Sequence, residues 1–164
     1  MTILLKNKHT LQIDDFKFRC CIGSKGLTLK KKEGDKKTPK GIYKISNLYF
    51  RKDRVLKPKT RLKCIEIKEN MNWCDDVNYP GSYNKLIRNS IKARHEKLFR
   101  KDHKYDLLIP IGYNLHKPVV NLGSCIFLHL TKNYKPTAGC IAVNKKDFLI
   151  ILKLINKKTK IKIS

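Results

Sequence analysis

Apolar residues occur along this chain in short runs, and in most of these runs they alternate with polar residues. Alternation with a period of two is typical of a β-strand that buries one face. Gly, Asn, Asp and Pro residues stand between the runs and indicate turns and loops. The pattern predicts strands over residues 3–5, 11–13, 16–22, 41–50, 61–68, 105–113, 125–130, 141–143 and 160–163.

Two segments have the apolar spacing of an amphipathic helix. Residues 85–101 carry apolar side chains among many charged ones. Asn144 is a good N-cap, and Asp147 completes a capping-box-like start to a helix that runs to Ile155. Loops without a period are predicted over residues 23–40 and 71–84. The many short strands indicate a mainly β (α+β) domain, a β-sandwich or partly open barrel with two or so peripheral helices.

The length of 164 residues suits one domain over residues 1–164, and the 41% of apolar residues allows a buried core. No stretch approaches the roughly 18 consecutive apolar residues of a membrane span. The start also lacks a signal-peptide pattern, because the apolar run stops after Leu5. The sequence therefore predicts no transmembrane segment. It places the protein in the cytoplasm unless an export signal has been removed.

The formal net charge is +25, from 38 basic and 13 acidic residues. Such an excess is compatible with a polyanionic partner such as nucleic acid, a membrane surface or an acidic wall polymer. The lysines are spread over nearly every segment, however, and form no continuous stripe. The sequence also has no RNP-like aromatic motif and no zinc-finger spacing, which disfavours nucleic acid as the partner. The charge indicates a general preference for acidic surfaces.

The cysteines form no CxxC motif, and none pairs with a histidine at zinc-finger spacing, so we expect no structural metal. Most of them lie in apolar, strand-like runs, where a buried and inert thiol is the default. Cys140 differs, because it follows a Pro-Thr-Ala-Gly turn at 136–139. The six cysteines are Cys20, Cys21, Cys64, Cys74, Cys125 and Cys140.

Cys140 and His129 together have the groups that nucleophilic catalysis needs. A thiol attacks a carbonyl well only when a nearby imidazole takes its proton. The eleven residues from His129 to Cys140 allow the chain to loop back and bring both side chains to one end of a sheet. Gly139 would let a substrate backbone approach and would let loop amides point to an oxyanion. On spacing alone, a core histidine beside a buried cysteine is the favoured interpretation.

Beyond this pair, a series of motifs runs along the chain. It comprises Glu-Gly-Asp at 33–35, Thr-Pro-Lys-Gly-Ile-Tyr at 38–43, an Arg-rich stretch at 49–54, Trp-Cys-Asp-Asp at 73–76, Tyr-Asn-Lys at 83–85, Tyr-Asp at 105–106, Gly-Tyr-Asn at 112–114, Gly-Ser-Cys-Ile-Phe-Leu-His at 123–129 and Thr-Ala-Gly-Cys at 137–140. With these motifs almost the whole chain resembles the YkuD-type L,D-transpeptidase catalytic domain, in a compact single-domain bacterial branch. Several ordered motifs are far more specific than one motif alone.

The resemblance implies a YkuD-like β-sandwich fold and a peptidoglycan enzyme of cell-wall biogenesis and cell shape. It implies that the Cys140 thiolate attacks a carbonyl of a tetrapeptide stem and releases the terminal D-residue, with His129 as general base and acid. The acyl group then passes to an amine of a neighbouring stem or to water. The resemblance also implies no metal and no cofactor, a covalent adduct with carbapenems, and a place in the periplasm or cell envelope.

The resemblance suggests roles for further residues. The amides of Gly139 and Cys140 are candidates for the oxyanion hole. A carbonyl near Gly123 or Ser124 is the candidate that orients the imidazole of His129. Candidates for substrate binding are Thr137, Trp73, Asp75, Asn84 and Arg51.

Two positions depart from the family pattern. Ala138 stands where many relatives have His, and Ala142 stands where they have an Arg that is well placed to meet a substrate carboxylate. Arg51, Arg54 or Arg88 could take over that role. Two alternatives therefore stay open. One is an L,D-carboxypeptidase or hydrolase of recycled wall peptides, which fits a start without an export signal. The other is a non-catalytic basic module that binds an acidic polymer.

Overall fold

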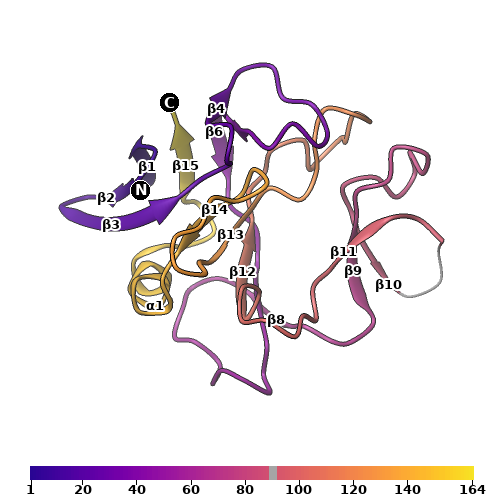
Figure 1. Cartoon of the computed structure of the whole chain (residues 1–164). Helices are drawn as coiled ribbons and strands as arrows, with labels where there is room; N and C mark the ends of the chain where they lie inside the picture. The colour runs from indigo at the N-terminus through magenta and orange to yellow at the C-terminus, as the bar shows by residue number, and fades with distance from the viewer. Residues whose placement is uncertain (89–91) are drawn as a thin grey trace.

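The computed structural model describes residues 1–88 and 92–164, and most of its regular structure is β-strand (Figure 1). The mainly β class is therefore confirmed. The elements are β1 (Thr2–Asn7), β2 (Thr10–Ile13), β3 (Phe16–Cys21), β4 (Leu27–Thr28), β5 (Thr38–Pro39), β6 (Gly41–Lys44), β7 (Leu48–Phe50), β8 (Cys64–Glu66), β9 (Met71–Cys74), β10 (Leu86–Arg88), β11 (His95–Lys97), β12 (Leu107–Pro110), β13 (Phe127–Leu130), β14 (Ile141–Val143), α1 (Lys145–Leu154) and β15 (Lys160–Ile163).

Ten strands form one sheet, in the order β6-β15-β1-β2-β3-β14-β13-β12-β7-β8. The sheet curls into a half-barrel, in agreement with the predicted partly open barrel (Figure 1). The first and last strands of the chain, β1 and β15, are neighbours in this sheet and run parallel. In the middle of the sheet β13 and β14 are also parallel, whereas their outer neighbours β12 and β3 run antiparallel to them.

Helix α1 begins where the capping pattern predicts. The Asn144 side chain accepts a hydrogen bond from the Asp147 amide at 2.9 Å, which satisfies one free donor of the first turn. Phe148, Ile151 and Leu152 form the buried face of the helix. These three side chains pack in the main core with the apolar residues of the large sheet. The predicted C-terminal helix is confirmed.

The second predicted helix, over residues 85–101, is wrong. The segment contains β10 and β11, which pair with the two edges of β9 in an antiparallel three-stranded sheet. β9 itself lies in the stretch 71–84 that was expected to be a loop. Pairing with β9 satisfies the hydrogen-bonding groups of the β10 and β11 backbones. The spacing of apolar residues within 85–101 contains no information about such pairing with another segment. Ile91 lies outside the described residues, and those residues hold one helix instead of two.

The side chains of β13 and β14 alternate between two separate clusters. One set faces the main core beside α1, and it consists of Leu128, Leu130, Ile141 and Val143. The opposite face carries Phe127, which packs edge-on against Trp73 of β9 with ring centroids 5.3 Å apart. Cys140 belongs to this second cluster. The three-stranded sheet therefore packs against the face of the large sheet that carries the candidate nucleophile.

Candidate active site

A cavity of about 490 Å³ lies on this second face, and both Cys140 and His129 line it. Its other walls come from the loop at 31–36, from the segment around 94–105 and from the turn at 131–138. The cavity thus combines segments that lie far apart in the sequence, from Lys31 to Ala142. Its lining is rich in charged groups of both signs, with lysines and arginines in the majority.

Two adjacent parallel strands bring Cys140 and His129 to the cavity. His129 on β13 lies opposite Ala142 on β14 in the strand register. Cys140 precedes Ala142 by two residues, so the period of two places its side chain on the same face as His129. A hydrogen bond joins the two segments at this point, because the Phe127 amide of β13 donates to Cys140 Sγ at 3.4 Å. The sequence spacing therefore places the thiol and the imidazole in one cavity.

Cys140 is held as a neutral thiol. Its side chain is buried, with a relative exposure of 8%. Its Sγ donates to the carbonyl oxygen of Cys125 at 3.0 Å. Burial raises the pKa of Cys140 to about 12, and the hydrogen bond from the Phe127 amide opposes this only in part. The proton of the resting thiol is thus directed at Cys125.

His129 is held as a neutral imidazole. Burial lowers the pKa of His129 to about 4, against a smaller opposite effect from its hydrogen bond to the Leu130 carbonyl. That bond joins Nδ1 to the Leu130 oxygen at 2.8 Å. Because a carbonyl oxygen can only accept, the hydrogen is on Nδ1 and Nε2 keeps its lone pair. The Tyr105 ring packs edge-on against the imidazole, with centroids 5.2 Å apart.

The carbonyl that contacts the imidazole differs from the one expected. We expected it near Gly123 or Ser124, whereas the oxygen belongs to Leu130, the next residue along β13. The segment around Gly123 contacts the other member of the pair instead, because the carbonyl of Cys125 accepts a hydrogen bond from the thiol of Cys140. Cys125 has a positive φ of 54°, an uncommon conformation for a residue with a side chain. The Asn84 side chain fixes it by accepting a hydrogen bond from the Cys125 amide at 3.1 Å.

The turn before Cys140 is fixed by glycine and two threonines. Gly139 has φ +143°, and a Cβ there would lie 2.9 Å from the Lys37 carbonyl oxygen, so a side chain does not fit. The Thr137 hydroxyl donates to the Cys140 carbonyl at 2.6 Å and accepts from the Gly139 amide at 3.1 Å. The Thr38 hydroxyl donates to the Gly139 carbonyl at 2.8 Å. The Gly139 amide, an expected oxyanion donor, is therefore already hydrogen-bonded to Thr137.

The expected substrate-binding residues divide into two groups. Thr137 and Asp75 line the cavity, and Asp75 is paired there with Arg94 at 3.1 Å. Trp73 and Asn84 are buried behind it, where the Trp73 indole donates to the Asn84 side chain at 3.0 Å. The positions of Trp73 and Asn84 suit support of the cavity wall rather than contact with a substrate.

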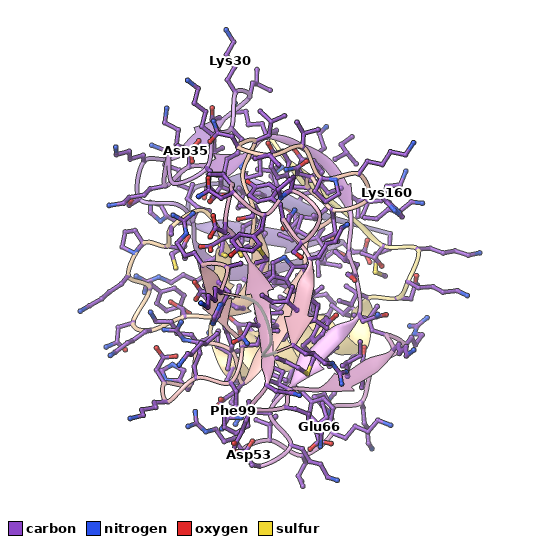
Figure 2. The ribbon with its side chains drawn as sticks, turned by 90° about the vertical axis from the view of Figure 1, so that its right-hand side faces the viewer. Lys30, Asp35, Asp53, Glu66, Phe99 and Lys160 are labelled. Carbon is purple, nitrogen blue, oxygen red and sulfur yellow. The ribbon has the colours of Figure 1, made fainter. Side chains whose placement is uncertain are left out.

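The arginines expected to meet a carboxylate lie elsewhere. Arg51 is buried, donates to both oxygens of Asp53 at 2.7 and 2.6 Å, and stacks 3.5 Å from the centroid of the Phe99 ring. Figure 2 shows Asp53 and Phe99 together at the lower end of the molecule. Neither Arg51 nor Arg54 nor Arg88 is among the described residues that line the cavity.

Sequence reasoning missed several residues that line the cavity. Glu33 was interpreted as part of a solvated loop, and Glu96, Arg100 and Lys104 were placed in or just after a helix that does not form. Tyr105 was placed in a predicted strand and in the Tyr-Asp motif, but no role in the cavity was predicted for it. The available signal was the resemblance itself, since Glu33 and Tyr105 stand in two of its motifs.

Two further findings concern the described part of the chain. It contains no cluster of three or more His, Cys, Asp or Glu side chains arranged to hold a metal ion. None of its helices is long and apolar enough to cross a membrane.

These features define a mainly β protein with a thiol and an imidazole in one cavity. In a comparison with protein families, residues 2–163 match the YkuD family, the L,D-transpeptidase catalytic domain. The chain therefore belongs to this family, whose enzymes are cysteine-dependent L,D-transpeptidases that act on peptidoglycan peptides. No curated protein and no solved structure matches the chain.

Proposed function

We propose that this chain is a single catalytic domain that transfers an acyl group between peptidoglycan stem peptides, with Cys140 as nucleophile and His129 as general base and acid. The observation that carries the proposal is the common cavity. Cys140 and His129 both line it from adjacent parallel strands, and Nε2 of His129 keeps a lone pair that can accept a proton because Nδ1 is bonded to Leu130.

In the first half of the proposed reaction, the thiol hydrogen turns from the Cys125 oxygen to His129 Nε2 as the donor carbonyl carbon approaches the sulfur. His129 Nε2 accepts the thiol proton as the sulfur attacks the carbonyl carbon. The tetrahedral intermediate then collapses, the carbon–nitrogen bond to the terminal D-residue breaks, and His129 returns the proton to the leaving amine. The products are a thioester on Cys140 and a free D-amino acid.

The resting protonation states favour proton transfer during the attack and not before it. Burial places the pKa of His129 near 4 and that of Cys140 near 12. Forming the thiolate–imidazolium pair in advance would cost on the order of 10 kcal/mol before the attraction between the two charges is counted. A reacting carbonyl removes the need for a free thiolate, since the negative charge passes on to the oxyanion.

In the second half, an amine of a neighbouring stem attacks the thioester. His129 removes a proton from the attacking nitrogen and delivers it to the Cys140 sulfur as the carbon–sulfur bond breaks. A new amide forms and the thiol is regenerated. The Cys140 amide is the proposed oxyanion donor in both halves, joined by the Gly139 amide once that amide leaves the Thr137 hydroxyl.

The proposed donor also needs a partner for its carboxylate, because Ala142 provides no charge on the cavity floor. Lys104, Lys132 and Lys135 line the cavity. Lys104 is only weakly paired, 3.9 Å from Asp102, and Lys132 and Lys135 are exposed. We therefore assign carboxylate recognition to these lysines in place of the arginine that many relatives have.

Product analysis tests the proposal. A tetrapeptide stem donor and an amine-bearing acceptor stem are incubated with the wild type, with Cys140→Ala and with His129→Gln, and the products are identified by mass spectrometry. The proposal predicts a cross-linked peptide from the wild type and none from the folded variants. A tripeptide stem without cross-linked product would instead identify an L,D-carboxypeptidase. Wild-type turnover in folded Cys140→Ala would refute the proposed nucleophile.

A further inference from the structure

One carboxylate in the cavity, Glu33, forms no direct ion pair with a described residue, although its charge contributes to raising the pKa of Arg94. Asp75 is paired with Arg94 at 3.1 Å, and Glu96 is paired with Arg100 at 2.8 Å. Glu33, the third acid in the lining, has no lysine, arginine or histidine nitrogen of the described residues within 4.0 Å. In a chain with a net charge of +25, a half-buried acid would be expected to attract a lysine.

Neutral donors hold the Glu33 carboxylate in place. Its Oε2 accepts hydrogen bonds from the Ser124 hydroxyl at 2.7 Å and from the Tyr83 hydroxyl. Tyr83 is fully buried, and burial raises its pKa well above the usual value, with the charge of Glu33 adding to the effect. Tyr83 therefore stays a phenol and a donor. These bonds fix the orientation of the carboxylate but do not neutralise its charge.

The buried lysine of the cavity wall is paired with another acid. Lys31 is buried against Gly123, and its ammonium group contacts Asp35 and the Lys32 carbonyl. Asp35 is itself fixed by the amides of Lys32 and Lys37 at 2.9 and 2.8 Å. Figure 2 shows Asp35 at the upper end of the molecule, below the extended side chain of Lys30. Asp35 thus neutralises Lys31, and Glu33 keeps a carboxylate in the cavity lining without an ion pair of its own.

Glu33 is also connected to the candidate nucleophile. Its hydrogen-bond donor Ser124 precedes Cys125, and the Cys125 carbonyl lies 3.0 Å from Cys140 Sγ. The Glu33 charge is therefore fixed to the same short segment that contacts the thiol. A positively charged group that bound Glu33 would lie in the same cavity as Cys140, next to the segment that contacts its thiol.

We propose that Glu33 is the residue that recognises a primary ammonium group of the stem peptide. The inference rests on the proposed acyl transfer, because transfer requires an amine-bearing peptide in this cavity. The ammonium group belongs either to the donor or to the acceptor stem. If it is the reacting amine, it releases one proton to solvent before attack, and its second proton goes through His129 to the Cys140 sulfur.

The test compares Glu33→Gln with the wild type in two steps. The first step is acylation of Cys140 by a β-lactam without an amino group, followed by intact mass. We expect the two proteins to be labelled at rates within about twofold, because this probe has no ammonium group. Failure to label the folded wild type would count against the proposed function itself, independently of Glu33.

The second step has two arms. The donor arm measures acylation of Cys140 by donor stems with a free or an acetylated amine. The acceptor arm measures transfer of the acyl group to an amine-bearing acceptor. We expect Glu33→Gln to lose about 10- to 100-fold in kcat/KM, mainly through KM, in the arm whose peptide carries the recognised ammonium. Acetylating the donor amine should reproduce the loss in the wild type if the donor is recognised. If it does not, the loss should appear in the acceptor arm.

Two variants keep the test decisive. Glu69→Gln removes an exposed acid outside the cavity lining and should behave as the wild type. Asp35→Asn leaves Glu33 intact but frees Lys31 to pair with it, so it should show the same selective loss. Wild-type kinetics of Glu33→Gln in both arms would overturn the proposal, as would an equal loss with the amine-free β-lactam.

Discussion

The charge states of Cys140 and His129 follow from where their side chains lie. Both face a cavity between two packed sheets, where burial disfavours the thiolate and the imidazolium alike. Hydrogen bonds from Phe127 and to Leu130 reduce these effects without reversing them. The proposed reacting pair is thus neutral in the resting protein, and in the proposed mechanism it becomes charged only as part of the reaction.

The low pKa of His129 predicts how stability depends on pH. Its pKa is about 4 in the folded chain, against the ordinary histidine value of 6.5. Between these values the unfolded chain binds a proton that the folded chain does not bind, so the free energy of unfolding falls as pH is lowered. The contribution of His129 is complete above pH 6.5 and lost towards pH 4, about 3 kcal/mol in all.

Urea unfolding at several pH values between 7 and 4 measures this contribution. His129→Gln should lose the slope of up to about 1.4 kcal/mol per pH unit that His129 adds. His9→Gln, on an exposed turn, is the matched control and should keep the wild-type slope. An unchanged slope in His129→Gln would mean that the imidazole is charged in the folded protein.

At the scale of elements, sequence patterns succeeded where the determining contacts are local. Helix α1 was predicted from Asn144 and Asp147, which are hydrogen-bonded to each other within one turn. The helix over 85–101 was wrong because β10 and β11 form through pairing with β9. Long-range pairing of this kind leaves no local signature.

The candidate site shows the same division. Cys140 and His129 were identified by a resemblance, and the parallel register of β13 and β14 places them together. Glu33 was not identified, because its hydroxyl partners Tyr83 and Ser124 are 50 and 91 residues away in sequence. Only the folded chain brings such groups into contact.

The turn before Cys140 depends on a hydrogen bond from a distant element, the Thr38 hydroxyl, and this dependence can be tested. Thr38 is fully buried, and its hydroxyl donates to the Gly139 carbonyl and accepts from the Gly23 amide at 2.9 Å. Thr38→Val should lower the free energy of unfolding by about 2 kcal/mol or more, because two buried backbone groups lose their partner. It should also slow the labelling of Cys140, since the turn is no longer held.

Chemical unfolding and the rate of β-lactam labelling measure these two effects. Thr28→Val is the control, because the Thr28 hydroxyl accepts only from the exposed amide of Lys30 at 3.0 Å. Wild-type stability and labelling in Thr38→Val would show that the turn is fixed without this hydroxyl.

At the scale of the whole molecule, the net charge of +25 gives the surface a general attraction to polyanions. We expect this attraction to be separate from the proposed chemical step, because most of the lysines lie outside the cavity lining whereas Cys140 and His129 are buried. A binding role for the surface and a catalytic role for the cavity are therefore compatible. Binding would keep the enzyme near an acidic polymer without contributing to the chemical step.

The salt dependence of polymer binding tests whether that binding comes from the surface charge and is independent of the cavity. Retention on an acidic polymer should fall as ionic strength rises, with a linear relation between log affinity and log salt concentration. Cys140→Ala should bind with the same affinity and the same slope as the wild type. Binding that resists salt, or that is lost in Cys140→Ala, would contradict the assignment of polymer binding to the surface charge.

The most direct test of the central claim, that Cys140 is an activated acyl-transfer nucleophile, is intact-mass labelling of the folded protein with a carbapenem. We expect one covalent adduct on the wild type, none on Cys140→Ala, and slower formation on His129→Gln. An adduct that persists in Cys140→Ala, or a folded wild type that forms none, would contradict it.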